Sequence, residues 1–226
     1  MPEEPAHLIL GIKVVSTDGD AAEDRFFPQR HPMTEPDRAA LRAELRARRR
    51  ALTATDRMRS GARVGEQLAE FLPPSGWLAG YWACDGELPL HALPPLPAAA
   101  RYCLPVLQPE CRLRFAGWLP GRPLRANRYG IPEPEVDQSA LLEPESLDLV
   151  LLPLLGFSRS GARLGSGGGY YDRSFAFLNA SPRPAAPRLI GVGYACQEIE
   201  HLRAEPWDVA LDLIITEREV IVPAAS

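Results

Sequence analysis

A glycine-rich segment at residues 163–173 carries the residue types best suited to chemistry. It reads Arg-Leu-Gly-Ser-Gly-Gly-Gly-Tyr-Tyr-Asp-Arg. Clustered glycines let backbone N–H groups turn inward together and bind an anion, and a helix N-terminus adds positive potential. Arg163 would supply a forked cationic contact to a phosphate, and Asp172 is placed to hold Mg²⁺ beside that phosphate. The segment therefore predicts a phosphate-binding loop.

This segment fits neither of the common nucleotide motifs. The dinucleotide pattern G-x-G-x-x-G fails because Tyr170 stands five positions after Gly165, and the P-loop pattern fails because its Lys-Ser/Thr pair is missing. A Gly/Ser-rich stretch is also typical of a flexible connector. The arginine before the glycines and the Tyr-Tyr-Asp-Arg after them favour a binding loop over a bare linker.

Three other residues are candidates for a site, and each has a simpler alternative. Asp208 would be a second magnesium ligand if the fold brings it to the glycine-rich segment, or else a turn or capping acid. Trp82 lies at the end of a predicted strand and Glu87 lies just past it, where α/β folds tend to place ligand contacts. Otherwise, Glu87 would be a helix N-terminal acid and Trp82 a core residue.

The composition excludes several kinds of catalytic group. The chain has 226 residues, 46% of them hydrophobic, and a net charge of −4, which fits one globular domain or two small ones. Its 25 basic residues comprise Lys13 and 24 arginines. A lysine nucleophile, a Schiff base or a P-loop lysine is therefore excluded beyond position 13. None of the four histidines sits in a metal-binding or Ser-His-Asp pattern, so phosphate must be bound by arginines, backbone N–H groups or a metal.

Cysteine spacing and hydropathy indicate the compartment. The four cysteines form no CxxC pair, and we interpret them as reduced thiols. No apolar run approaches the roughly 20 residues that cross a bilayer, and the first residues lack the pattern of a signal peptide. We expect a cytoplasmic monomer that is not embedded in a membrane.

Two helices are predicted near the beginning of the chain. Thr34-Glu35-Pro36-Asp37 has the pattern of a helix N-terminus, with a helix over about residues 36–52 and a second over about 55–71. On the first helix Leu41, Leu45 and Leu52 share one face. An adjacent stripe consists of Arg38, Arg42, Arg46 and Arg49. The stripe would face a cleft, solvent or a nucleic-acid backbone; the acidic pI of 5.7 and the lack of interleaved aromatic residues argue against nucleic acid.

The pattern then changes to short apolar runs separated by turn residues. The predicted strands are residues 77–83, 102–107, 112–118, 147–155, 189–194 and 210–216. Residues 149–155 are apolar on both faces, which indicates a central strand covered on both sides, and a helix is expected over 170–178. Together these elements predict a layered α/β domain with a mixed sheet and helices on both faces, preceded by the helical pair.

Residues 1–33 differ from the rest of the chain, with one short apolar stretch, an acidic run and a net charge of −3. We interpret them as a disordered extension or as a mis-assigned start, because Met33 stands directly before the first predicted helix. Residues 34–226 would then form the whole domain.

Several separated blocks resemble the 5-formyltetrahydrofolate cyclo-ligases, also called methenyltetrahydrofolate synthetases. The most specific block is Leu-Gly-Phe at 155–157, followed by Gly-x-Arg-Leu-Gly-x-Gly-x-Gly-Tyr-Tyr-Asp-Arg at 161–173. The supporting blocks, in matching order, are residues 41–46, Glu87, residues 129–134, Gln197, Asp208 and residues 211–217. The resemblance spans roughly residues 38–216 and implies the NagB/RpiA/CoA-transferase-like fold.

The resemblance implies ATP- and Mg²⁺-dependent ring closure of 5-formyltetrahydrofolate, with or without a polyglutamate tail, to 5,10-methenyltetrahydrofolate. Arg163 and Asp172 would be catalytic, and Asp172 with Asp208 would hold magnesium. The residues implied for ATP are Arg38, Arg42, Arg163, Leu164, Gly165, Ser166, Gly167, Gly168, Gly169, Tyr170 and Tyr171. The residues implied for the folate are Trp82, Glu87, Ser166, Gly167, Gly168, Gly169 and Tyr170.

Three positions depart from the family pattern. Arg38 stands where the family usually has lysine, Ser158 where aspartate is common, and Gly168 where some members have lysine. Arginine keeps the charge but changes the donor geometry. These departures leave open an alternative, a non-catalytic folate or nucleotide binder on the same fold.

Overall fold

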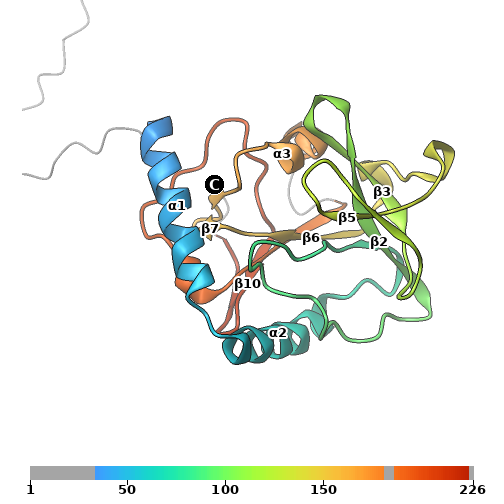
Figure 1. The fold of residues 1–226 in the computed structure, drawn as a ribbon, viewed down its shortest axis with the longest axis horizontal. Coiled ribbons are helices and arrows are strands. Elements are labelled where there is room, and N and C mark those ends of the chain that lie inside the picture. Colours follow the sequence, from blue (N-terminus) through green and yellow to red (C-terminus); the bar gives the residue numbers. More distant parts are fainter. Residues whose placement is uncertain (1–33, 181–185, 224–226) are drawn as a thin grey trace, which may run out of the picture. The chain divides into compact units, whose positions relative to one another are not determined.

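A seven-stranded mixed sheet organises the part of the chain that the computed structural model describes, residues 34–180 and 186–223 (Figure 1). The strand order is β11-β10-β9-β6-β1-β2-β3. The strands are β1 (Ser75–Ala79), β2 (Ala99–Gln108), β3 (Arg112–Gly117), β6 (Leu149–Pro153), β9 (Arg188–Val192), β10 (Leu213–Ile215) and β11 (Val220–Ile221). Neighbouring strands from β10 to β2 are parallel, and the edge strands β3 and β11 are antiparallel to their neighbours. The predicted mixed α/β fold is confirmed, whereas the prediction for residues 1–33 lies outside the described residues.

Strand β6 is the central strand, as its apolar sequence predicts. Leu149 and Leu151 belong to the core on one face of the sheet, while Val150 and Leu152 belong to the core on the other face, and all four are at most 2% exposed. Helix α2 (Ala54–Leu68) packs its Val64 and Leu68 into the first core. Helix α3 (Tyr170–Ser174) lies on the opposite side of the sheet (Figure 1). The sheet is therefore buried on both faces.

Helices α1 (Glu35–Arg50) and α2 each begin one residue before the predicted start, directly after a capping threonine. Thr34 and Asp37 form a capping box at α1, and Thr53 and Asp56 form one at α2. Leu45 on α1 is completely buried in a small core with Leu155, Ala162, Leu164 and Leu202. This packing fixes α1 beside the hairpin of β7 (Gly156–Phe157) and β8 (Arg163–Leu164).

Helix α3 is shorter than the predicted helix over residues 170–178. The Ser174 hydroxyl donates to the Tyr170 carbonyl and accepts the N–H of Leu113 on β3, at 2.7 Å in both cases. Phe175 then leaves the helical conformation, with φ −110° and ψ 14°, and a 3₁₀ helix, Ala176–Ala180, follows. The serine side chain competes with the helical hydrogen bond and ties the end of α3 to the sheet.

The remaining elements are short. A hairpin of β4 (Leu124–Ala126) and β5 (Pro132–Pro134) lies outside the main sheet. Further 3₁₀ helices are Ala69–Phe71, Pro109–Cys111, Gln138–Ala140, Pro144–Ser146 and Ala195–Gln197. All four cysteines are free thiols. Across the described ranges, none of the helices combines the length and apolar character needed to span a bilayer.

Candidate active site

A cleft of about 620 Å³ opens where the central parallel strands end. Leu152 and Pro153 of β6 form part of its wall, together with Tyr81 and Trp82, which follow β1. Every residue that the sequence marks as a candidate lines this one cleft: Arg38, Arg42, Trp82, Glu87, Arg163, Leu164, Gly165, Ser166, Gly167, Gly168, Gly169, Tyr170, Tyr171, Asp172 and Asp208. Residues more than 120 positions apart in the chain thus share one surface.

Arginines hold the glycine-rich loop by its carbonyl oxygens. Arg42 Nε donates to Gly165 O at 3.2 Å, Arg46 Nη2 to Ser166 O at 3.4 Å, and Arg173 Nη1 to Gly168 O at 2.7 Å. These contacts neutralise the negative ends of the peptide dipoles around the cleft. The loop also uses left-handed backbone at Gly167 (φ +104°) and Gly169 (φ +67°), which glycine adopts without a steric cost. Such alternation is what an inward-facing N–H nest requires.

Arg38 contributes positive charge at the α1 side of the cleft. Its Nη2 lies 2.5 Å from Glu205 Oε1 and donates to Arg203 O at 3.4 Å. Its Nε is buried without a hydrogen-bond partner among the described residues. A buried donor of this kind is a group that a phosphate oxygen would satisfy. Of the predicted arginine stripe, Arg38 and Arg42 line the cleft, whereas Arg46 and Arg49 pair with Asp85.

The acids Asp172 and Asp208 lie near one another. Asp172 Oδ1 accepts a hydrogen bond from Arg163 Nη2 and one from Val209 N at 3.2 Å, and Asp208 Oδ2 accepts from Glu205 N at 2.8 Å. Burial raises the pKa of Asp208, and the neighbouring Asp172 charge raises it further. A divalent cation would relieve this repulsion.

The donor set fits magnesium better than a metal that needs a full protein cage. Within residues 34–180 and 186–223, no cluster of three or more His, Cys, Asp or Glu side chains is arranged to hold a metal. Mg²⁺ is commonly bound by one or two carboxylates completed by substrate phosphates and water. Two acids beside a phosphate-type loop match that pattern.

Glu87 and Trp82 line the cleft beyond the end of β1. Glu87 Oε2 accepts the Cys84 N–H at 3.1 Å and the Cys84 thiol at 3.5 Å. Burial raises the pKa of Glu87, an effect that the Cys84 N–H and the Arg49 charge partly oppose. Trp82 is 40% exposed and meets Trp118 edge to face, with ring centroids 6.1 Å apart. It is therefore not a core residue, and Glu87 does not begin a helix.

The β4–β5 hairpin supplies cleft residues for which no role was predicted from the sequence. Asn127 and Tyr129 line the cleft, and the Tyr129 ring meets Tyr170 edge to face, with the hydroxyl oxygens 3.2 Å apart. Arg128 Nη2 also donates to the Tyr170 hydroxyl. Trp207, 65% exposed, lines the cleft near Asp208. The only sequence signal for the hairpin was the family block at residues 129–134.

The fold and the cleft define a class: a mixed-sheet α/β protein with a glycine-rich anion loop, a pair of acids and a buried carboxylate around one cleft. The model of the 5-formyltetrahydrofolate cyclo-ligase family matches residues 34–217. The chain belongs to this family.

Two named relatives and two solved structures are similar to this chain over most of their length. The 5-formyltetrahydrofolate cyclo-ligase of Haemophilus influenzae is 33% identical over 191 residues, covering 81% of this chain and 100% of the relative. That of Escherichia coli K12 is 34% identical over 182 residues, covering 78% and 98%. The NMR structure of Aquifex aeolicus 5,10-methenyltetrahydrofolate synthetase superposes with a TM-score of 0.68 at 27% identity, covering 84% and 94%. The corresponding Mycoplasma pneumoniae structure gives 0.58 at 27% identity, covering 80% and 99%.

Proposed function

We propose that this protein is an ATP- and Mg²⁺-dependent enzyme that closes 5-formyltetrahydrofolate to 5,10-methenyltetrahydrofolate, releasing ADP and phosphate. One observation carries the proposal: in a member of the cyclo-ligase family, the glycine-rich loop, the two acids and Glu87 all line one cleft. The enzyme is expected to act as a monomer in the cytoplasm.

The chemistry requires activation of a poor leaving group. The formyl oxygen attacks the γ-phosphorus of ATP, the bond to ADP breaks, and the formyl carbon becomes an activated imidate-like centre. The 10-nitrogen then attacks that carbon, loses its proton, and phosphate departs with the formyl oxygen. Positioning and neutralisation of charge matter more here than a strong base.

Different residues of the cleft would bind the ATP phosphates and the magnesium ion. Arg38 and Arg42 would contact the ATP phosphates, and residues 163–171 would surround them with N–H groups and the Arg163 guanidinium. Asp172 and Asp208 would hold magnesium, which supplies charge neutralisation on the transferred phosphoryl group. Arg163 lies against Asp172 and is 8% exposed, so its charge acts in a partly desolvated site.

The folate side of the cleft is a carboxylate beside an aromatic ring. Glu87 would accept hydrogen bonds from pterin N–H groups, and the exposed Trp82 ring would pack against the planar pterin. The segment from Ser166 to Tyr170 would contact both substrates, because the transferred group passes between them. The length of the folate's glutamate tail is left open by this arrangement.

The test is a continuous near-ultraviolet assay for methenyltetrahydrofolate with purified protein, 5-formyltetrahydrofolate, ATP and Mg²⁺. We expect product that depends on all three components. Folded protein that binds both ligands by calorimetry and yields no product would instead identify a non-catalytic binder.

A further inference from the structure

The loop that carries Glu87 turns tightly at Asp85 and Gly86. Asp85 has a left-handed backbone, with φ +47°, and Gly86 continues it with φ +77°. Asp-Gly is a pair that such a turn favours, and the Glu87 N–H closes the turn by donating to the Cys84 carbonyl at 2.9 Å. The Asp85 side chain is held by side chains of α1.

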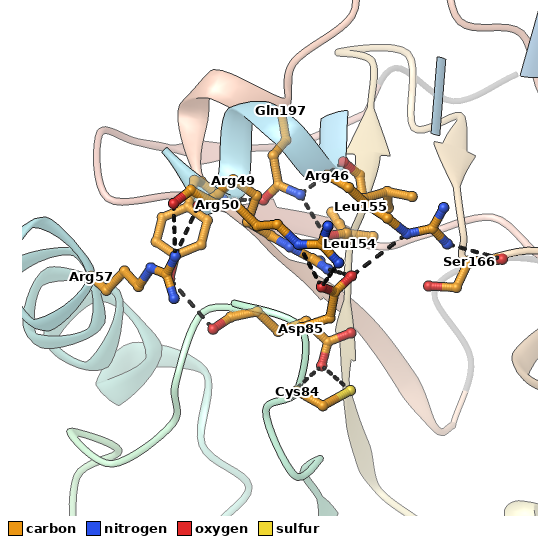
Figure 2. A network of polar contacts seen from close by, with 12 residues as sticks. Arg46, Arg49, Arg50, Arg57, Cys84, Asp85, Leu154, Leu155, Ser166 and Gln197 are labelled. Carbon is orange, nitrogen blue, oxygen red and sulfur yellow. Dashed lines mark hydrogen bonds and ion pairs between the residues drawn. The ribbon is translucent and has the colours of Figure 1, made fainter. Parts of the chain in front are cut away.

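Three arginines of α1 converge on the Asp85 carboxylate, as Figure 2 shows. Arg49 Nη2 lies 2.9 Å from Oδ2, and Arg50 donates to Oδ1 from Nη2 at 2.5 Å and from Nε at 3.0 Å. Arg46 Nε lies 3.5 Å from Oδ2. One carboxylate thus faces three guanidinium groups, and we call these four residues the Asp85 cluster.

Arg49 makes the Asp85 cluster more than a surface ion pair. Arg49 is only 1% exposed, so its charge is removed from water and Asp85 is its acidic partner. Breaking a buried pair leaves an uncompensated charge, which costs far more than losing an exposed pair. Arg57 Nη2 fixes the end of α1 in addition, by donating to the carbonyls of Arg49 and Arg50 at 3.3 and 3.2 Å.

The Asp85 cluster lies between the two halves of the cleft. On one side, Glu87 follows Asp85 by two residues and binds the Cys84 N–H, so the held backbone fixes the direction of the Glu87 carboxylate. On the other side, Arg46 spans from Asp85 to the carbonyl of Ser166 in the glycine-rich loop (Figure 2). A shift of either loop is therefore transmitted to Arg46.

We propose that the Asp85 cluster positions Glu87 and joins it to the glycine-rich loop, so that nucleotide and folate binding strengthen one another. This inference rests on the proposed function, since it assigns the two ligands to the two loops. Asp85 and Arg49 are positioning residues in this scheme, acting through Glu87, while Arg46 carries the connection. Coupling of this kind is reciprocal: each ligand raises the affinity for the other by the same factor.

The test is Asp85→Asn, which keeps the side-chain shape and removes the charge. We expect the KM for 5-formyltetrahydrofolate to rise tenfold or more, with kcat at saturating substrates within about threefold of the wild-type value. Calorimetry of folate binding, with and without a non-hydrolysable ATP analogue and Mg²⁺, should show at least fivefold enhancement by the analogue in wild type and less than twofold in the variant.

The matched control is Glu219→Gln, which removes an acid from the exposed pair with Arg159 and should change neither KM nor the enhancement. If Asp85→Asn does not fold, Arg46→Gln tests the same connection, because it cuts the contact to Ser166 and leaves Arg49 paired. Unchanged enhancement in a folded Asp85→Asn or Arg46→Gln variant, or no enhancement in wild type, would overturn the proposal. Hydrogen exchange of residues 83–88, expected to quicken in Asp85→Asn, needs no turnover. It therefore separates failure of the cluster from failure of the proposed function.

Discussion

Replacing Gly167 with alanine tests the glycine-rich loop without crowding it. A Cβ at this position would meet no atom closer than 3.7 Å, where the guanidinium carbon of Arg42 lies, so the methyl group has room. The backbone, however, has φ +104°, which a residue with a side chain rarely adopts. Holding alanine there costs about 1–3 kcal/mol, and the free loop would relax away from the binding conformation.

That penalty must be repaid each time ATP binds, so we expect the KM for ATP to rise roughly 5- to 150-fold, at 1.4 kcal/mol per tenfold. The assay is initial-rate kinetics with ATP varied at saturating folate. Gly121→Ala is the matched control: it has φ +88°, open space around a Cβ and a position in a loop that does not line the cleft. A Gly167→Ala enzyme with a KM for ATP within twofold of wild type would refute the assignment of this backbone to phosphate binding.

Three further substitutions probe the site and its support. Asp172→Asn weakens the acceptor for Arg163 and removes the charge of the proposed magnesium ligand. The activation free energy should therefore rise by about 2–4 kcal/mol and the Mg²⁺ requirement should increase; unchanged Mg²⁺ titrations would remove Asp172 from the site. Glu87→Gln should lower folate affinity yet raise the melting temperature at pH 7.5, because burial raises the pKa of Glu87 and the ionised form destabilises the fold. That gain should vanish as the pH falls below the ordinary value of 4.5, and a gain that persists there would contradict burial as its cause. Leu45→Ala empties a fully buried site and should cost about 2–5 kcal/mol in urea unfolding; a loss below 1 kcal/mol would show that α1 does not depend on it.

The start of the first helix, the central strand and the glycine-rich segment could be predicted from short stretches of sequence. The N-terminal pattern at Thr34 marks the start of α1, and the apolar run that begins at Leu149 marks the central strand. The glycine-rich segment could be placed after that strand because it follows the apolar run closely in the sequence. These features are encoded within a few residues of one another.

Long-range packing decides what the sequence leaves open. Asp208 lies near Asp172 only because residues 198–212 bring the chain back to the cleft. The spacing of the two acids in the sequence does not indicate that they are close together. The arginine stripe could be found by periodicity, but the buried Arg49 pairs with Asp85, 36 residues away, a contact that periodicity does not indicate. Helix α3 ends early because Ser174 bonds to β3, a contact that no helix pattern contains.

Isotopic labelling of the formyl oxygen tests the proposed phosphoryl transfer most directly. 5-Formyltetrahydrofolate labelled with ¹⁸O in the formyl group would be turned over with ATP and Mg²⁺, and the released phosphate analysed by mass spectrometry. We expect one ¹⁸O atom in each phosphate, in equal amount to the methenyl product, because the proposed reaction transfers the phosphoryl group to that oxygen. Unlabelled phosphate, or methenyl product formed without ATP, would contradict the account.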